Sequence, residues 1–241
     1  MHRLQALIRA IAVPALLGFC VSGCALGRSV IDVSVPAPTN VSDNSTHIVK
    51  IIEVRDLRHF EVNPNDPSQP SLSKAEEIVD SKITSHAIGR KRGGYGNALG
   101  DLALPENKTV ASVIKDATRT AFQERGYKVV DEGSPDYGRA IPIAVDVGQF
   151  WAWMRPGFVE LTLSLESQVT LQGKDVIDSD SALVVGHYSI GTGAALGSEW
   201  VKTIQAGLGD LIQKMELKIK PQNGAGTAAP QTSAAPTGAG S

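Results

Sequence analysis

Residues 159–171 read VELTLSLESQVTL, and apolar and polar side chains alternate along almost the whole stretch. The apolar set is Val159, Leu161, Leu163, Leu165, Val169 and Leu171, and the polar set is Glu160, Thr162, Ser164, Glu166, Gln168 and Thr170. Because successive side chains of a strand point to opposite faces, the pattern predicts a strand with one buried and one solvent-facing side. Such strands are typical of an antiparallel sheet with one face on the core.

The neighbouring segments extend this sheet and add a helix. Residues 141–153 (IPIAVDVGQFWAW) predict the preceding strand, which an RPG turn at 155–157 joins to it. Residues 182–190 predict the strand that follows. A helix capped by Ser198 then begins. Its apolar stripe is Val201, Ile204, Leu208, Leu211, Ile212, Met215 and Ile219.

An earlier part of the chain predicts a second helix and two more strands. One helical face carries Val110, Val113, Ile114, Ala117, Ala121 and Phe122. Gly126 follows where a left-handed C-cap belongs. Residues 48–54 (IVKIIEV) and 128–131 (KVVD) predict strands. Two helices on one face of a mostly antiparallel sheet form a two-layer α+β sandwich, which is the fold class that we expect.

The N-terminus has the features of a lipoprotein signal. Arg3 and Arg9 flank the start of an apolar run at 10–19, which is too short to cross a bilayer core of roughly 30 Å as a helix. The VSGC sequence at 21–24 resembles the bacterial lipobox, and the resemblance implies cleavage before Cys24 and acylation of this cysteine. Cys20 would leave with the signal, so that the mature chain has no possible internal disulfide. The alternative is a soluble secreted protein with an ordinary cleavage site.

Acylation predicts the location of the mature protein. Two or three acyl chains anchor a protein stably, since each buried methylene adds about 0.8 kcal/mol. The similarity to enterobacterial lipoprotein sorting implies that Ala25 directs the protein to the outer membrane, facing the periplasm. Loss of Arg3 and Arg9 leaves 21 Lys and Arg against 25 Asp and Glu, a net charge of −4. We therefore expect no nucleic-acid partner.

The composition divides the chain into four parts. Residues 1–23 form the signal peptide, and residues 24–47 form a lipidated tether with a short strand at 30–35. Residues 48–220 form one α+β domain, which includes an irregular excursion over 56–104. Residues 221–241 (PQNGAGTAAPQTSAAPTGAGS) carry no charge and no large apolar side chain, which predicts a disordered tail.

The chain resembles the YajG-like family of bacterial lipoproteins. The resemblance depends on the lipobox, on VRDLR at 54–58, on ERGYKVV at 124–130 and on the order of elements over about 48–218. It implies an envelope location and this fold, and it implies little about activity. The element order also resembles the lipoprotein that plugs the lipopolysaccharide-export barrel and the auxiliary lipoproteins of lipid-transport ABC systems.

A basic, glycine-rich segment lies at 89–101, GRKRGGYGNALGD. Its spacing matches neither the Walker loop nor the GxGxxG fingerprint, so a nucleotide site is not expected. Arg90, Lys91 and Arg92 are a candidate anion contact, for a phospholipid headgroup, for lipopolysaccharide phosphates or for an acidic protein. The alternative is a solvated hairpin turn whose charges keep the loop soluble.

An aromatic cluster lies beside the RPG turn. Trp151, Trp153 and Met154 sit at a predicted hairpin tip, where both faces cannot be buried. Exposed apolar patches mark partner or membrane contacts, so these residues are a candidate contact with an envelope protein. The alternative is that both tryptophans share one strand face and cap the core against the helices.

The sequence contains no catalytic or metal-binding motif that we recognise. It lacks HExxH, HxH and GxSxG, and the acidic cluster at 175–180 lacks the spacing of a calcium loop. We therefore expect no catalytic residue, no metal and no cofactor. The expected function is that of a non-enzymatic accessory or protein-interaction module of the envelope, and the alternative is a lipid- or lipopolysaccharide-binding accessory of a transport system.

Overall fold

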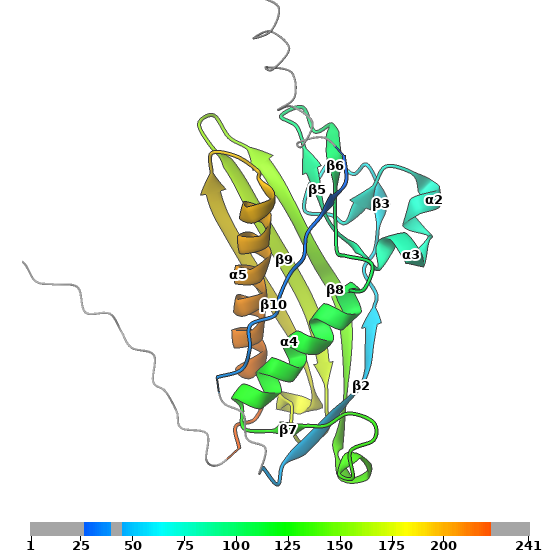
Figure 1. Ribbon diagram of the computed structural model, residues 1–241, viewed down its shortest axis with the longest axis vertical. Helices are drawn as coiled ribbons and strands as arrows, with labels where there is room; N and C mark the ends of the chain where they lie inside the picture. Colours follow the sequence, from blue (N-terminus) through cyan, green and yellow to red (C-terminus); the bar gives the residue numbers. More distant parts are fainter. Residues whose placement is uncertain (1–26, 40–44, 223–241) are drawn as a thin grey trace, which may run out of the picture.

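Three long antiparallel strands form one side of an eight-stranded sheet in the computed structural model, which describes residues 27–39 and 45–222 (Figure 1). They are β8 (Ile141–Pro156), β9 (Leu161–Gln172) and β10 (Ser181–Thr192). The β8–β9 and β9–β10 ladders both run the full length of β9. This meander is the framework on which the other elements are placed.

Five shorter strands extend the sheet beyond the free edge of β8. They are β1 (Ser29–Val30), β2 (Ile48–Asp56), β5 (Ala87–Arg92), β6 (Ala98–Ala103) and β7 (Lys128–Val129). β2 runs parallel to the first part of β8, and β5 runs parallel to it farther along. β7 pairs with β2, β6 forms a hairpin with β5, and β1 runs parallel to β6. The eight-stranded sheet is therefore mixed, with its longest ladders antiparallel.

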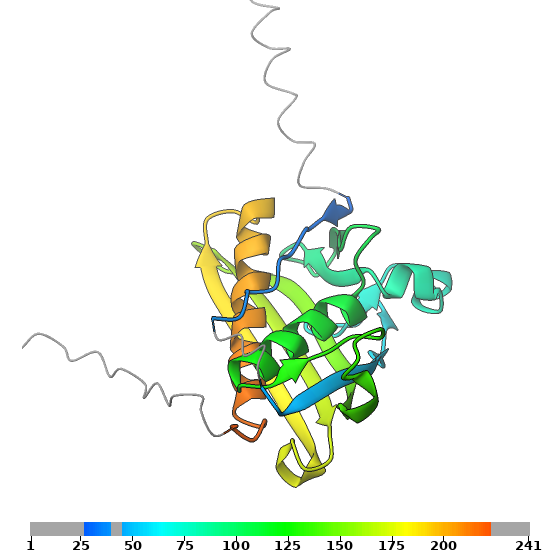
Figure 2. The same ribbon diagram turned by 60° about the horizontal axis from the view of Figure 1, so that its bottom comes forward.

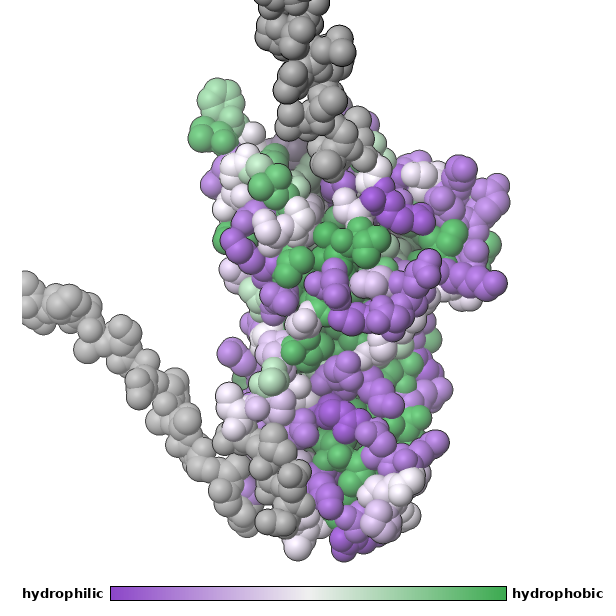
Figure 3. Space-filling view, in the orientation of Figure 1, coloured by the Kyte–Doolittle hydropathy of each residue, from purple (hydrophilic) through white to green (hydrophobic). Residues whose placement is uncertain are grey.

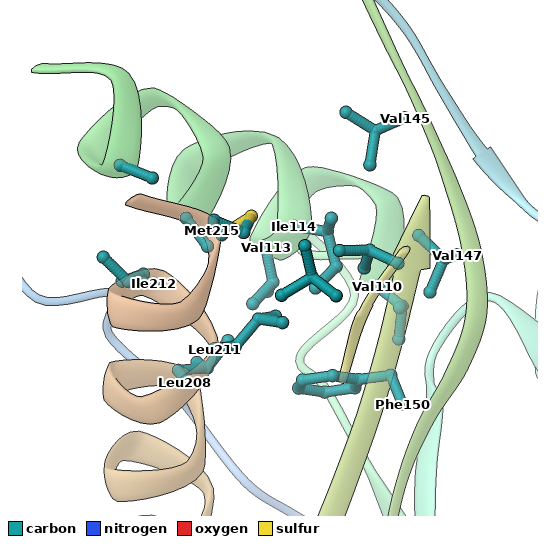
Figure 4. Close-up of a cluster of buried hydrophobic side chains, with 14 of the residues drawn as sticks. Val110, Val113, Ile114, Val145, Val147, Phe150, Leu208, Leu211, Ile212 and Met215 are labelled. Carbon is teal, nitrogen blue, oxygen red and sulfur yellow. The ribbon is translucent and has the colours of Figure 1, made fainter. Parts of the chain in front are cut away.

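Two helices, α4 (Val110–Glu124) and α5 (Gly197–Glu216), cover one face of this sheet (Figures 1 and 2). Thr109 and Ser112 form a capping box at the start of α4. Figure 4 shows how side chains of both helices meet those of β8 in the core: Val110, Val113, Ile114, Val145, Val147, Phe150, Leu208, Leu211, Ile212 and Met215.

We keep the name excursion for residues 57–86, between β2 and β5; this segment folds into short elements and covers part of the opposite face. It contains β3 (Glu61–Val62), β4 (Ser71–Leu72), α2 (Ala75–Ile78) and α3 (Ser81–Thr84). β3 and β4 form a separate parallel pair. Outside the excursion, two short 3-10 turns, η2 (Tyr137–Arg139) and η3 (Asp178–Asp180), precede β8 and β10. A second hydrophobic cluster lies under the excursion: Phe60, Leu72, Ala87, Trp151 and Trp153.

The structure confirms the predicted fold class and the buried faces of both helices. All the apolar residues predicted on the face of the first helix are buried in α4, and Gly126 has the left-handed φ of +85°. Two details differ. The helix α5 begins at Gly197 with Leu196 as its N-cap, so Ser198 does not cap it. The strand β9 begins at Leu161, so Val159 lies in the preceding turn and is exposed.

The segment 27–39 packs on the domain, in contrast to the tether that we expected. Ile31 and Val33 are buried in the main core, and the Thr120 hydroxyl donates to the Pro36 carbonyl at 3.1 Å. Figure 2 shows this segment passing over α5 and beside α4. The reason is that its alternate apolar side chains complete the helix layer. The signal peptide, Cys24 and the tail from 223 lie outside the described residues.

Candidate functional site

The three consecutive cations lie in strand β5 and are buried, which corrects the expectation of an exposed loop. Arg90 is 1% exposed, Lys91 4% and Arg92 7%. The hairpin turn comes after them, where Gly93 donates its backbone N–H to the Asn97 carbonyl at 2.8 Å. The excursion covers the two arginines, and residues 27–39 approach the lysine. Tertiary contacts therefore enclose the basic residues of β5, although their composition is typical of a surface loop.

Strand alternation sends the cations to two sides. The Lys91 ammonium donates to the Ser29 hydroxyl at 3.0 Å, beside the N-terminal segment. Arg90 and Arg92 contact the excursion: Arg90 donates to the Ser73 hydroxyl, and Arg92 donates to the Pro64 carbonyl and to the Ser71 hydroxyl. The two arginines therefore share one local environment, and Lys91 does not belong to it.

Arg90 and Arg92 line a cavity of about 690 Å³ between the excursion and the β5–β6 hairpin. We call it the arginine cavity; its wall also includes Asn63, Asn65, Ser73, Tyr95 and Asn97. None of the described residues that line it is acidic. The wall thus combines two guanidinium groups with amide and hydroxyl groups, all of which can donate hydrogen bonds.

The hydrogen-bonding capacity of the two arginines is incompletely used within the described residues. The Nε and Nη1 atoms of Arg90 and the Nε atom of Arg92 are buried without a hydrogen-bond partner. The nearest carboxylate to Arg90 is Asp101, with 3.7 Å between Arg90 Nε and Asp101 Oδ1. Burial, and next the positive charge of Arg90, lower the pKa of the Arg92 guanidinium. An anion bound beside Arg90 and Arg92 would offset the repulsion between their positive charges.

The aromatic cluster at the other candidate site is also buried, so it offers no partner surface. Trp151 is 0% exposed, Trp153 5% and Met154 6%. The ladder between β8 and β9 skips Gly148, and this bulge reverses which side chains face the helices. Trp151 and Trp153 consequently share one face, as the alternative interpretation held, but they pack under the excursion and not under the helices. Met154 joins the main core.

The exposed apolar side chains near this turn are ones that the sequence analysis had not singled out. Phe158 and Val159 in the β8–β9 turn are 105% and 90% exposed, and Tyr95 in the β5–β6 turn is 103% exposed. These are the three most exposed of the large hydrophobic side chains in the described residues. Figure 3 shows a hydrophobic knob where Figure 1 draws the tip of the β8–β9 hairpin. The sequence did contain a signal for this exposure, because Phe158 and Val159 directly follow the Pro156–Gly157 turn.

Sheet topology brings these turns to one end of the molecule. Because β5 runs parallel to β8, their hairpin turns point the same way. β10 ends beside the start of β9, so the loop with Leu196, which is 61% exposed, lies there too. We call this the hairpin end, defined by residues 93–97, 157–160 and 193–196 (Figure 1).

The N-terminal segment enters the described structure at the hairpin end. The Gly27 backbone N–H donates to the Leu99 carbonyl at 2.8 Å, one residue inside β6. Gly100, with φ of +147°, allows this approach, because a Cβ there would lie 1.8 Å from the Gly27 carbonyl oxygen. Cys24 therefore precedes, by three residues, a point that is fixed at this end of the sheet.

Two kinds of feature were sought in the described residues, metal-ligand clusters and membrane-spanning helices. These residues contain no group of three or more His, Cys, Asp or Glu side chains arranged to hold a metal ion. Within the same residues, no helix combines the length and apolar composition needed to cross a bilayer. The arginine cavity and the hairpin end are the candidate sites; a further cavity of about 600 Å³ has Leu72, His86 and Leu102 in its wall.

No family model matches the chain, and no curated protein matches it. Among solved structures, it is similar to a Xanthomonas campestris protein of the family DUF330, with 13% identity, a TM-score of 0.41, and coverage of 78% of this chain and 91% of that one. It is also similar to an uncharacterized protein, with 9% identity, a TM-score of 0.38, and coverage of 78% and 98%. Likenesses at this level say nothing about function, and the resemblance to the YajG-like lipoproteins stays a prediction.

Proposed function

We propose that this protein is a non-enzymatic accessory lipoprotein of the bacterial envelope, anchored to the outer membrane by acylated Cys24 and facing the periplasm. In this proposal the hairpin end rests on the membrane surface, and the rest of the sheet extends away from it. The lipobox supplies the anchor, and the resemblance to the YajG-like lipoproteins supports the location.

The observation that carries the proposal is the coincidence of two features at the hairpin end. The most exposed hydrophobic side chains, Phe158, Tyr95 and Val159, lie at the end where Gly27 is fixed to the sheet. Three residue steps separate Gly27 from Cys24, which is at most about 11 Å of extended chain. A lipid attached to Cys24 would therefore hold this end, and not another, close to the bilayer.

The acyl chains and the exposed side chains have different roles in this arrangement. Full burial of a side chain such as phenylalanine contributes about 1.5–3 kcal/mol, which is too little to hold a protein on a membrane by itself. Two acyl chains anchor it stably. The exposed turns then orient the domain, because an anchor of three residues alone leaves rotation free.

The burial of the aromatic cluster limits where a protein partner could bind. Trp151, Trp153 and Met154 are core residues, so an envelope protein partner would have to use another surface. The second candidate function, a lipid- or lipopolysaccharide-binding accessory, is favoured by the arginine cavity, since a lipid phosphate is an anion that its wall suits.

Metabolic labelling tests the anchor. Cells expressing the full chain are grown with radioactive palmitate, and the protein is immunoprecipitated from separated inner and outer membranes. We expect label in the wild-type protein in the outer membrane, and none in Cys24→Ser. Cys20→Ser is the matched control and should be labelled normally, because it alters a cysteine that leaves with the signal. Labelled Cys24→Ser, or unlabelled wild-type protein, would overturn the proposal.

A further inference from the structure

We propose that Arg90 and Arg92 bind a phosphate group in the arginine cavity, either that of a lipid headgroup or that of a small phosphate ester. This binding site goes beyond the membrane anchoring proposed above and does not depend on it. The cavity, the two guanidinium groups and their unpartnered nitrogen atoms are the observations from which it follows.

The first step is the cost of the buried charges. A buried cation without a compensating anion is strongly destabilising, and buried arginines in proteins are normally paired. Here two of them lie on alternate residues of β5 and repel each other. Three of their six side-chain nitrogen atoms have no hydrogen-bond partner within the described residues. These three atoms are enclosed by the protein, so an anion in the cavity offsets the charge of the two guanidinium groups and reaches these atoms only if the side chains shift.

The second step is that the neighbouring carboxylates do not supply them. The Asp101 Oδ1 atom lies 3.7 Å from Arg90 Nε and has no hydrogen-bond partner of its own. Burial raises the pKa of its carboxyl above the usual value, although Arg90 acts in the opposite direction. Asp66, the other carboxylate near Arg92, is half exposed and is engaged by Ser68 and Arg155.

The third step is the class of anion. Arginine forks match the oxygens of phosphate. A phosphate monoester carries about −1.5 to −2 charge near pH 7 and offsets both guanidinium charges, whereas the phosphodiester of a headgroup such as phosphatidylglycerol carries about −1 and offsets one. The amides of Asn63 and Asn97 in the wall provide further donors. The volume of about 690 Å³ exceeds that of phosphate alone and accommodates the group that carries it.

The position of the cavity allows both sources of phosphate. Its wall includes Tyr95, Gly96 and Asn97 of the β5–β6 turn, so it lies at the hairpin end. A headgroup would reach it from the bilayer if this end rests on the membrane, and a soluble ester would reach it from the periplasm. The experiment must therefore compare the two.

Calorimetric titration of the purified full-length lipoprotein in nonionic detergent tests the proposal. The probes are inorganic phosphate, glycerol 3-phosphate and dihexanoyl phosphatidylglycerol. We expect at least one to bind, and we expect Arg92→Gln and Arg90→Gln each to weaken binding by about tenfold to a hundredfold, as for a lost charge-assisted hydrogen bond. Tighter binding of the lipid identifies a headgroup site, and tighter binding of glycerol 3-phosphate identifies a soluble ester site.

Lys91→Gln is the matched control, because it removes the same charge from the opposite side of the same strand. It should leave affinity nearly unchanged. Arg92→Lys keeps the charge and replaces the glutamine variants if they do not fold. It should bind the probe measurably more weakly than the wild type, because lysine lacks the planar fork of arginine. Absence of binding to all three probes, or an equal loss in Lys91→Gln and the arginine variants, would overturn the proposal.

Discussion

At the scale of single residues, the charge balance around β5 is the unusual feature of this protein. Arg90 and Asp101 face each other across the β5–β6 ladder, yet their closest nitrogen and oxygen atoms are 3.7 Å apart, too far for a hydrogen bond. The pair is therefore an ion pair without the hydrogen bonds that usually stabilise a buried one. Its contribution to stability depends on the protonation state of Asp101.

The pH dependence of stability reports on this state. Burial raises the pKa of Asp101, against the opposing effect of Arg90, so the folded protein binds its proton more tightly than the unfolded chain does. Stability from this group is then present below the unfolded pKa of about 3.9 and is lost as the pH rises toward the folded value. We expect the unfolding free energy of the wild type, minus that of Asp101→Asn, to fall as the pH rises from about 4.

Denaturant unfolding of both proteins at a series of pH values between acid and neutral measures this difference. Asparagine does not titrate, so effects of all other groups that are common to both proteins cancel. A difference that rises with pH would show that the effect of Arg90 on the pKa of Asp101 exceeds that of burial, and that Asp101 is an ordinary ionised partner.

At the scale of elements, the close approach of α5 to the sheet depends on two glycines. A Cβ on Gly207 of α5 would lie 2.5 Å from the nearest Leu165 side-chain atom and 3.2 Å from its Cβ. A Cβ on Gly186 of β10 would meet the Leu211 backbone at 3.2 Å. The helix therefore lies on β9 and β10 at a distance that only small residues allow.

Two alanine variants in the same helix test this contact. Gly207→Ala should lower the free energy of unfolding by about 1–3 kcal/mol, because it overpacks the interface with Leu165. Gly209→Ala has open space around its Cβ and should raise the free energy by about 0.5–1 kcal/mol through helix propensity. Thermal unfolding followed by circular dichroism measures both. Equal shifts of the same sign would mean that Gly207 is not a packing position.

Periodicity in the sequence predicts the elements that present one side to the core. It does not predict the burial of residues that distant segments of the chain cover. The stripes of α4 and α5 and the alternation of β9 are visible in the sequence because each element presents one side to one core. The orientation of Trp151 depends on the bulge at Gly148, which pairing with β9 reveals and composition does not. The burial of Arg90 depends on the excursion folding back over β5, a long-range contact with no local signature.

At the scale of the whole molecule, the parallel pairing of β5 with β8 has the greatest consequence. It brings two hairpin turns and the N-terminal segment to the same end, and the order of elements alone did not predict it. The lipobox predicts a lipid anchor at Cys24, and the strand patterns predict the sheet downstream of it. Neither pattern indicated that residues 27–39 pack on the helices, which would shorten the connection between the proposed anchor and the domain.

We propose that the hairpin end faces the membrane, and a fluorescent label placed at this end tests the orientation. If Cys24 is acylated and Cys20 leaves with the signal, as proposed, Phe158→Cys introduces a single reactive thiol into the mature protein. Leu217→Cys, at the opposite end of α5, is the control, since Leu217 is 75% exposed. Each variant is labelled with an environment-sensitive fluorophore and reconstituted into phosphatidylethanolamine–phosphatidylglycerol vesicles that contain a spin-labelled lipid.

We expect strong quenching and a blue-shifted emission for the label at position 158, and weak quenching for the label at position 217. Equal quenching at the two positions, or stronger quenching at position 217, would contradict it.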